Sequence, residues 1–185
     1  MRKLSHSELQ IRQSSVQASA EKTPLRVVLN NIRSLYNVGS IFRTADGIGI
    51  EKLCLCGITP IPPDTQITKT ALGAEKVVPW KFYKTAAEAI KAASADGFEI
   101  VLLEQTVKSI PYQNFEPIRP VCLVLGNEVA GVSDELVSLA ERSVEIEMVG
   151  LKNSLNVAVA FGIVGYQFRS KLITQRSKLQ MKTEL

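Results

Sequence analysis

Two polar side chains suited to handling an anion stand early in the chain. We predict that Asn37 caps a helix that also carries Gly39 and Arg43, and that Gly39 lets another backbone or a ligand phosphate approach its first turn. Arg43 is a cation on an otherwise apolar stretch. It either binds an anionic ligand or pairs with a carboxylate such as Asp46, and this segment alone leaves both open.

A second group of polar residues directly follows an apolar run. Val121–Leu125 leads straight into Gly126, Asn127 and Glu128, with a further glycine at Gly131. Polar groups between glycines at the carboxyl end of a strand expose backbone amides and carbonyls to a ligand. A plain tight turn explains the glycines, but it explains Glu128 less well.

A third polar group lies where a strand passes through Gly150 into a helix beginning near Ser154. Ser154 and Asn156 are therefore expected in the first turn of that helix. Small residues follow along it: Ala158, Ala160, Gly162 and Gly165. Their spacing permits close approach of a neighbouring element or of a partner subunit, and core packing is the simpler interpretation.

Together the three segments resemble the motifs of the SpoU (TrmH-like) branch of the SPOUT superfamily, the S-adenosylmethionine-dependent RNA 2′-O-ribose methyltransferases. The resemblance covers residues 25–168 and rests on N-x-x-x-x-x-N-x-G-x-x-x-R-x-A-D-x-x-G, then L-G-N-E-x-x-G, then I-x-M-x-G followed by S-L-N-V-x-V-A. Leu35, Val129 and Glu147 stand where the family often has proline, glycine and proline. These departures affect loop rigidity more than chemistry.

The resemblance implies a fold and a set of site residues. The fold is an α/β domain with a C-terminal deep trefoil knot, whose loops hold S-adenosylmethionine, and with active sites at a homodimer interface. The implied cofactor residues are Leu125, Gly126, Asn127, Glu128, Gly131, Ile146, Met148, Ser154, Leu155 and Asn156. The implied catalytic residues are Asn37, Arg43, Glu128, Ser154 and Asn156, and the implied RNA contacts are Arg33, Asn37 and Arg43.

The implied reaction places a ribose 2′-oxygen in line with an activated methyl group and assists loss of the hydroxyl proton. An arginine does not readily give up its proton, so we expect Arg43 to orient the RNA phosphate and stabilise the nascent alkoxide. Only RNA presents this hydroxyl, so a structured RNA is the expected partner. Between the two candidate classes of RNA, we favour tRNA over rRNA. The alternatives are a non-catalytic RNA-binding protein of the same fold, a base methyltransferase of the superfamily and a flavodoxin-like binding domain.

The elements that must position these segments alternate between strands and helices. Apolar runs predict strands at 25–30, 52–56, 98–103, 121–125 and 143–148. Helical spacing predicts helices at 37–47, 85–95, 133–140 and 154–168, and the proline-rich stretch 57–64 predicts a loop. This alternation implies an α/β fold with a mostly parallel sheet and helices on both faces.

Composition narrows the function classes further. The chain has 185 residues, 45% of them hydrophobic and 22% charged, which is typical of one globular domain. The only histidine is His6, so histidine-based catalysis and most metal sites are disfavoured, and no metal is expected. Neither GxGxxG nor GxxxxGK[ST] occurs. No apolar run is long enough to span a membrane.

The cysteines and the N-terminal residues indicate the compartment. Cys54, Cys56 and Cys122 lie in apolar runs without a CxxC pair, so buried, reduced thiols are expected. The N-terminal residues contain no apolar stretch typical of a secretory signal. Both observations favour the cytoplasm. The Ser- and Arg-rich N-terminal segment leaves an organellar transit peptide as the alternative, with Glu8 and Glu21 against it.

The net charge of +4 is concentrated at the two ends of the chain. We divide the chain into a basic extension at 1–24, a methyltransferase domain at 25–168 and a basic tail at 169–185. The basic termini predict phosphate contacts on a structured RNA. Solubilising tails are an equally good interpretation.

Overall fold

The computed structural model describes residues 1–19 and 21–183. Its centre is a seven-stranded sheet in the order β3-β2-β1-β6-β4-β7-β5, in which each pair of neighbouring strands is parallel. The strands are β1 (Thr23–Asn30), β2 (Ile50–Cys56), β3 (Trp80–Tyr83), β4 (Glu99–Leu103), β5 (Ile110–Pro111), β6 (Val121–Leu125) and β7 (Arg142–Glu145). A parallel sheet of this kind requires helical cover on both faces.

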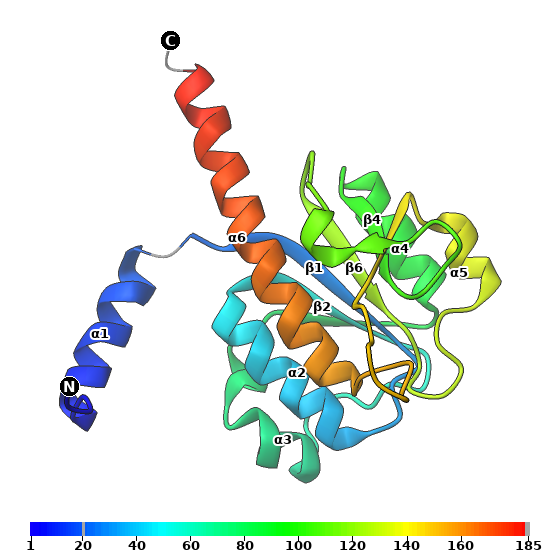
Figure 1. Ribbon diagram of the computed structural model, residues 1–185. Helices are drawn as coiled ribbons and strands as arrows, with labels where there is room; N and C mark the ends of the chain where they lie inside the picture. The colour runs from blue at the N-terminus through cyan, green and yellow to red at the C-terminus, as the bar shows by residue number, and fades with distance from the viewer. Residues whose placement is uncertain (20, 184–185) are drawn as a thin grey trace.

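Helices cover both faces of the sheet (Figure 1). They are α1 (His6–Ser19), α2 (Leu35–Ile48), α3 (Thr65–Ala71), α4 (Ala86–Ala95), α5 (Asp134–Leu139) and α6 (Val157–Thr183). One face carries α2, α3 and α6, and the other carries α4 and α5. In Figure 1, α1 lies apart from the sheet and the end of α6 projects beyond it.

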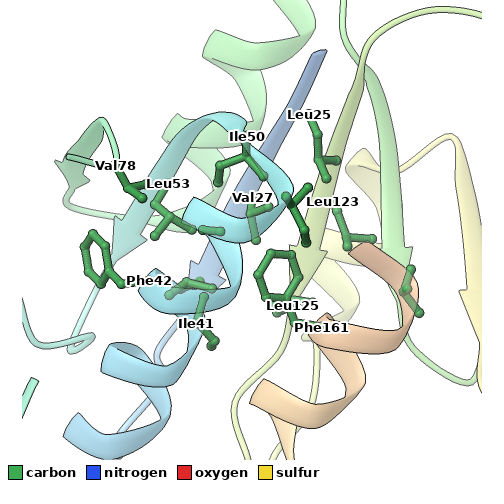
Figure 2. Close-up of a cluster of buried hydrophobic side chains, with 14 of the residues drawn as sticks. Leu25, Val27, Ile41, Phe42, Ile50, Leu53, Val78, Leu123, Leu125 and Phe161 are labelled. Carbon is green, nitrogen blue, oxygen red and sulfur yellow. The ribbon is translucent and has the colours of Figure 1, made fainter. Parts of the chain in front are cut away.

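The larger core lies between the sheet and the pair α2 and α6. Figure 2 shows Phe161 of α6 close to Val27 of β1 and Leu125 of β6, whereas Phe42 of α2 lies toward Leu53 of β2 and Val78. Alternate strand residues point to opposite faces, so Val28 joins the second core while its neighbours join the first. Near-continuous apolar runs in the central strands are the consequence of this double burial.

The predicted parallel α/β arrangement is confirmed, with differences at the edges. The strand expected to reach Met148 ends at Glu145, and the helix expected at 154–168 spans 157–183. Helix α6 therefore continues past residue 168, where the sequence predicted the end of the domain. Phe168 and Leu172 of this helix are both buried in the core. The sequence patterns did not predict α1, α3, β3 or β5.

Gly39 is required by packing between two helices. A Cβ there would overlap Oγ1 of Thr70 and the backbone oxygen of Ile67 in α3. Of the two interpretations offered for this glycine, close approach of another backbone is therefore the one that the structure supports. This approach fixes α3 against the first turns of α2.

The expected thiols are present in the core. Cys54, Cys56 and Cys122 are free and buried. Burial raises the pKa of Cys54 to about 11, with smaller opposing effects of nearby Lys52 and Arg26. The pKa values of the other two thiols are raised further by the same burial.

Candidate functional site

A cavity of about 740 Å³ opens at the carboxyl edge of the sheet. Its walls are the segments that follow β4, β6 and β7, together with the start of α6. β6 pairs with β4 on one side and β1 on the other, and Leu125 lies level with Leu103 and Leu29. The loops after these strands therefore meet at one edge, as expected for a ligand site in an open α/β sheet.

The expected cofactor residues all line this cavity. They are Leu125, Gly126, Asn127, Glu128, Gly131, Ile146, Met148, Ser154, Leu155 and Asn156. Arg33, Asn37 and Arg43 are outside the lining set. The structure thus brings the second and third motifs together around one space and leaves the first motif beside it.

Glu128 connects the cavity wall to the start of α2. Its carboxylate accepts hydrogen bonds from the backbone N–H groups of Arg33 (2.9 Å) and Ser34 (3.1 Å), and from Nδ2 of Asn37 (3.1 Å). Burial by itself would raise the pKa of Glu128. The backbone donors, of which Arg33 contributes most, together with Asn37 outweigh it and lower this pKa below its ordinary value.

Asn37 does not cap α2 as the sequence suggested. The cap is Ser34, whose Oγ accepts the Asn37 backbone N–H at 3.3 Å, and the helix begins at Leu35. The Asn37 side chain instead spans two motifs: it donates to Glu128 and accepts from Nδ2 of Asn156 at 3.0 Å. Because Ser34 caps the helix, the Asn37 side chain can form hydrogen bonds with residues that are distant in the sequence.

Asn156 caps the N-terminus of α6. Its Oδ1 accepts from the backbone N–H groups of Ala158 (3.0 Å) and Val159 (3.4 Å), which is a capping arrangement. The expectation that Ser154 and Asn156 lie in the first helical turn is therefore wrong: α6 begins at Val157. Because Asn156 caps the helix, Ser154 falls in the exposed loop before it.

The turn after β6 is closed by its own residues. Asn127 exchanges backbone hydrogen bonds with Gly131 at 3.0 and 2.9 Å, and its Nδ2 donates to the Asn31 carbonyl at 2.6 Å. Gly131 has a φ of +64°, and a Cβ on Gly126 would lie 2.5 Å from the Gly131 carbonyl carbon. Both glycines are thus needed for this fold of the cavity wall.

Arg43 is exposed on α2, and in the described part of the chain its guanidinium has no hydrogen bond or ion pair. The alternative of a bridge to Asp46 is therefore not what the structure contains. An unpaired, exposed guanidinium is available to an anionic ligand such as a phosphate.

Several polar residues of the cavity were not predicted from the sequence, notably Glu104, Asp134 and Glu145. Glu104 directly follows β4, and its Oε2 accepts from the backbone N–H of Val132 at 3.1 Å. The rule used for Glu128, a polar residue at the carboxyl end of an apolar strand, would also have found Glu104. For Asp134 and Glu145 the sequence carried no comparable signal.

Two absences hold for the described residues, 1–19 and 21–183. No group of three or more His, Cys, Asp or Glu residues there is placed to hold a metal ion. No helix there is long and apolar enough to cross a membrane.

The part of the chain that contains the cavity is similar to known proteins. The profile of the SpoU rRNA Methylase family matches residues 24–166. The tRNA (guanosine(18)-2′-O)-methyltransferase of Aquifex aeolicus is 31% identical over 144 residues, which are 77% of this chain and 67% of the relative. The Escherichia coli K12 protein of the same name is 27% identical over 143 residues, 77% of this chain and 62% of the relative.

Solved structures show the same fold. An AdoMet-bound rRNA methyltransferase from Sinorhizobium meliloti has a TM-score of 0.76 and 30% identity, covering 82% of this chain and 58% of that one. The A. aeolicus TrmH/SpoU tRNA modifying enzyme has a TM-score of 0.76 and 26% identity, covering 95% and 87%. The chain spans 62% of the length of the E. coli relative.

Proposed function

The chain belongs to the SpoU rRNA methylase family, and from this membership we propose that it transfers a methyl group from S-adenosylmethionine to a ribose 2′-hydroxyl of structured RNA. The observation that carries the proposal is the cavity whose wall includes every expected cofactor residue. We favour tRNA over rRNA because the relatives from A. aeolicus and E. coli are named as tRNA methyltransferases.

The residues of the cavity fit this cofactor. The volume of about 740 Å³ lies in the range of small-molecule sites, and the lining mixes apolar side chains such as Leu125 and Ile146 with polar ones. The turn at Gly126 and Gly131 brings backbone groups to the surface of the cavity. The cofactor, when bound, supplies a methyl group already activated by its sulfonium.

This chain's own residues then position the acceptor. Glu128, Asn37 and Asn156 form a continuous set of hydrogen bonds that fixes the start of α2 against the cavity wall. Arg43 lies further along the same helix with its guanidinium unpaired. In this proposal Arg43 binds the RNA phosphate, orients the 2′-hydroxyl and stabilises the developing alkoxide as its proton leaves.

We also propose that the cavity loops belong to a deep trefoil knot and that the active form is a homodimer. The knot is supported by the convergence of the segments after β6 and β7 on one cavity. The dimer is supported by Arg43, which is outside the wall of its own chain's cavity. Exposed apolar side chains on α2 and α6, namely Tyr36, Val159 and Tyr166, offer a surface for the second copy.

Fewer cations of the basic ends are available to RNA than the sequence predicted, because several of them have partners within the chain. Arg2 pairs with Glu8, and Arg169 donates to Thr23 and to the Ile48 carbonyl. Lys171 donates to the carbonyls of Gln113 and Phe115 and to the Glu116 carboxylate.

The proposed phosphate contacts therefore fall to exposed cations near the N-terminus, Lys3, Arg12 and Lys22. Glu184 and Leu185 of the predicted tail, and the side chains of Lys178 and Lys182, lie outside what the structure describes.

Methyl transfer from labelled S-adenosylmethionine to unmodified tRNA and, separately, to rRNA tests the function. A methylated ribose blocks alkaline cleavage at its 3′ phosphate, so label is expected in alkali-resistant dinucleotides from tRNA. Label in ordinary mononucleotides would indicate a base methyltransferase. Cofactor and RNA binding without label would indicate the non-catalytic alternative, and Arg43 would then lose its assigned role.

A further inference from the structure

The cavity wall is acidic. Four carboxylates line it, those of Glu104, Glu128, Asp134 and Glu145, and within the described chain no lysine, arginine or histidine lines it. The rest of the lining consists of apolar or uncharged polar residues. This imbalance contrasts with the whole chain, which carries a net charge of +4.

None of these carboxylates is neutralised by a cation from the described residues. The ion pairs found there involve other acidic residues, for example Asp96 with Arg26 and Glu116 with Lys171. Protein walls lower the local dielectric and concentrate the field of such charges. Within one chain the cavity is therefore a favourable environment for a cation.

Hydrogen bonds hold three of the carboxylates in place. Glu104 accepts from the backbone N–H groups of Gln105 (2.9 Å) and Val132 (3.1 Å), and Glu145 accepts from Oγ of Ser109 at 2.5 Å. Glu128 is engaged with the start of α2. The bound oxygens of Glu104 and Glu145 still have acceptor capacity, so these two groups are oriented without being saturated.

We propose that this acidic wall makes the cavity selective for the positive charge that methyl transfer removes. The inference rests on the proposed function. S-adenosylmethionine carries a sulfonium and an ammonium cation against a single carboxylate, whereas S-adenosylhomocysteine, the product, has no net charge. The wall therefore binds the methyl donor more tightly than the spent product, and it favours release of the product after each turnover.

The charge balance of the reaction gives the reason. The ribose oxygen takes the methyl group, the methyl carbon–sulfur bond breaks with its electron pair remaining on sulfur, and the hydroxyl proton passes to water. The sulfonium becomes a neutral thioether. The attraction between that centre and the carboxylates is thus present before transfer and lost after it.

Binding measured by calorimetry on the full chain tests the inference without any turnover. The ligands are S-adenosylmethionine, S-adenosylhomocysteine and sinefungin, in which an ammonium-bearing carbon replaces the sulfonium. The variants are Asp134→Asn and Glu145→Gln; an amide oxygen can still accept from Ser109. The matched controls are Glu135→Gln and Glu147→Gln, which remove neighbouring exposed carboxylates outside the cavity lining.

We expect the wild-type chain to bind both cationic ligands more tightly than the neutral product. Each cavity variant should weaken binding of the cationic ligands by about threefold to tenfold and leave product binding unchanged, while the controls change neither. Equal weakening of all three ligands, or no weakening in either cavity variant, would overturn the inference. If the wild-type chain bound none of the three, the proposed function itself would fall, and the charge selectivity with it.

Discussion

Asn156 donates a hydrogen bond to Asn37 across 3.0 Å, although the two residues are 119 positions apart. The same Asn37 side chain donates to Glu128, and Asn156 also caps α6. One amide of α2 is therefore connected to both the turn after β6 and the start of α6. The three sequence motifs are joined through side chains as well as through the backbone.

The depressed pKa of Glu128 predicts a pH effect on stability. A carboxylate whose pKa is lower folded than unfolded contributes stability above its unfolded pKa, and this contribution is lost as the pH falls through the folded pKa. On acidification from about pH 6 to about pH 3, Glu128→Gln should lose less unfolding free energy than the wild-type chain. Urea unfolding at a series of pH values measures this.

The exposed Glu135→Gln variant is the control for that comparison, since no hydrogen bond holds the Glu135 carboxylate in the described chain. It should follow the wild-type pH dependence. Parallel curves for Glu128→Gln and the wild type would contradict the role assigned to the Glu128 carboxylate.

Substitution Arg43→Lys tests the need for a planar guanidinium. A lysine keeps the charge but loses the forked donors that match a phosphate, so turnover should fall by about a hundredfold. The unfolding midpoint should not change, because Arg43 is exposed and unpaired in the described chain. Near-normal turnover at neutral pH would show that a point charge suffices.

Substitution Gly39→Ala should destabilise the fold. Its methyl group would overlap Oγ1 of Thr70 and the backbone oxygen of Ile67, and backbone cannot move aside cheaply. We expect a loss of about 1–3 kcal/mol in unfolding free energy, measured by chemical denaturation. The adjacent Ser40→Ala should be neutral or slightly stabilising, because alanine favours the helix. Equal stability of the two variants would argue against this close contact of α2 and α3.

Removal of the N-terminal residues 1–21 tests the RNA role of the basic end. Phosphate contacts release counterions, so the truncated chain should bind tRNA more weakly and with a shallower dependence on salt concentration. At the other end a cut must come after Leu172, because this residue is buried in the core. Unchanged tRNA binding at every salt concentration would leave these residues as solubilising extensions.

The sequence predicted the central strands because they are buried on both sides, and double burial produces continuous apolar runs. It missed β3, Trp80–Tyr83, because this strand is only partly buried and contains the exposed Lys81. It missed α3 because seven residues with Ile67 and Ala71 buried give too short a periodic signal. Local patterns thus identify the interior of the sheet better than its margins.

The site shows a similar division. The family resemblance located the cavity residues, but the capping rule misassigned Asn37, since that rule considers only nearby backbone donors. The side-chain partners of Asn37 lie 91 and 119 positions away, in Glu128 and Asn156. Asp134 and Glu145 become cavity residues only when the segments after β6 and β7 meet in space.

The position of β1 has a consequence for synthesis of the chain on the ribosome. β1 pairs with β2 on one edge and with β6 on the other, yet β6 is translated only after β2, β3 and β4. Until then the apolar β1 keeps an open edge, which is a template for pairing with other chains. Nascent chains stalled before Val121 should therefore depend on chaperones, whereas longer ones can close the sheet themselves.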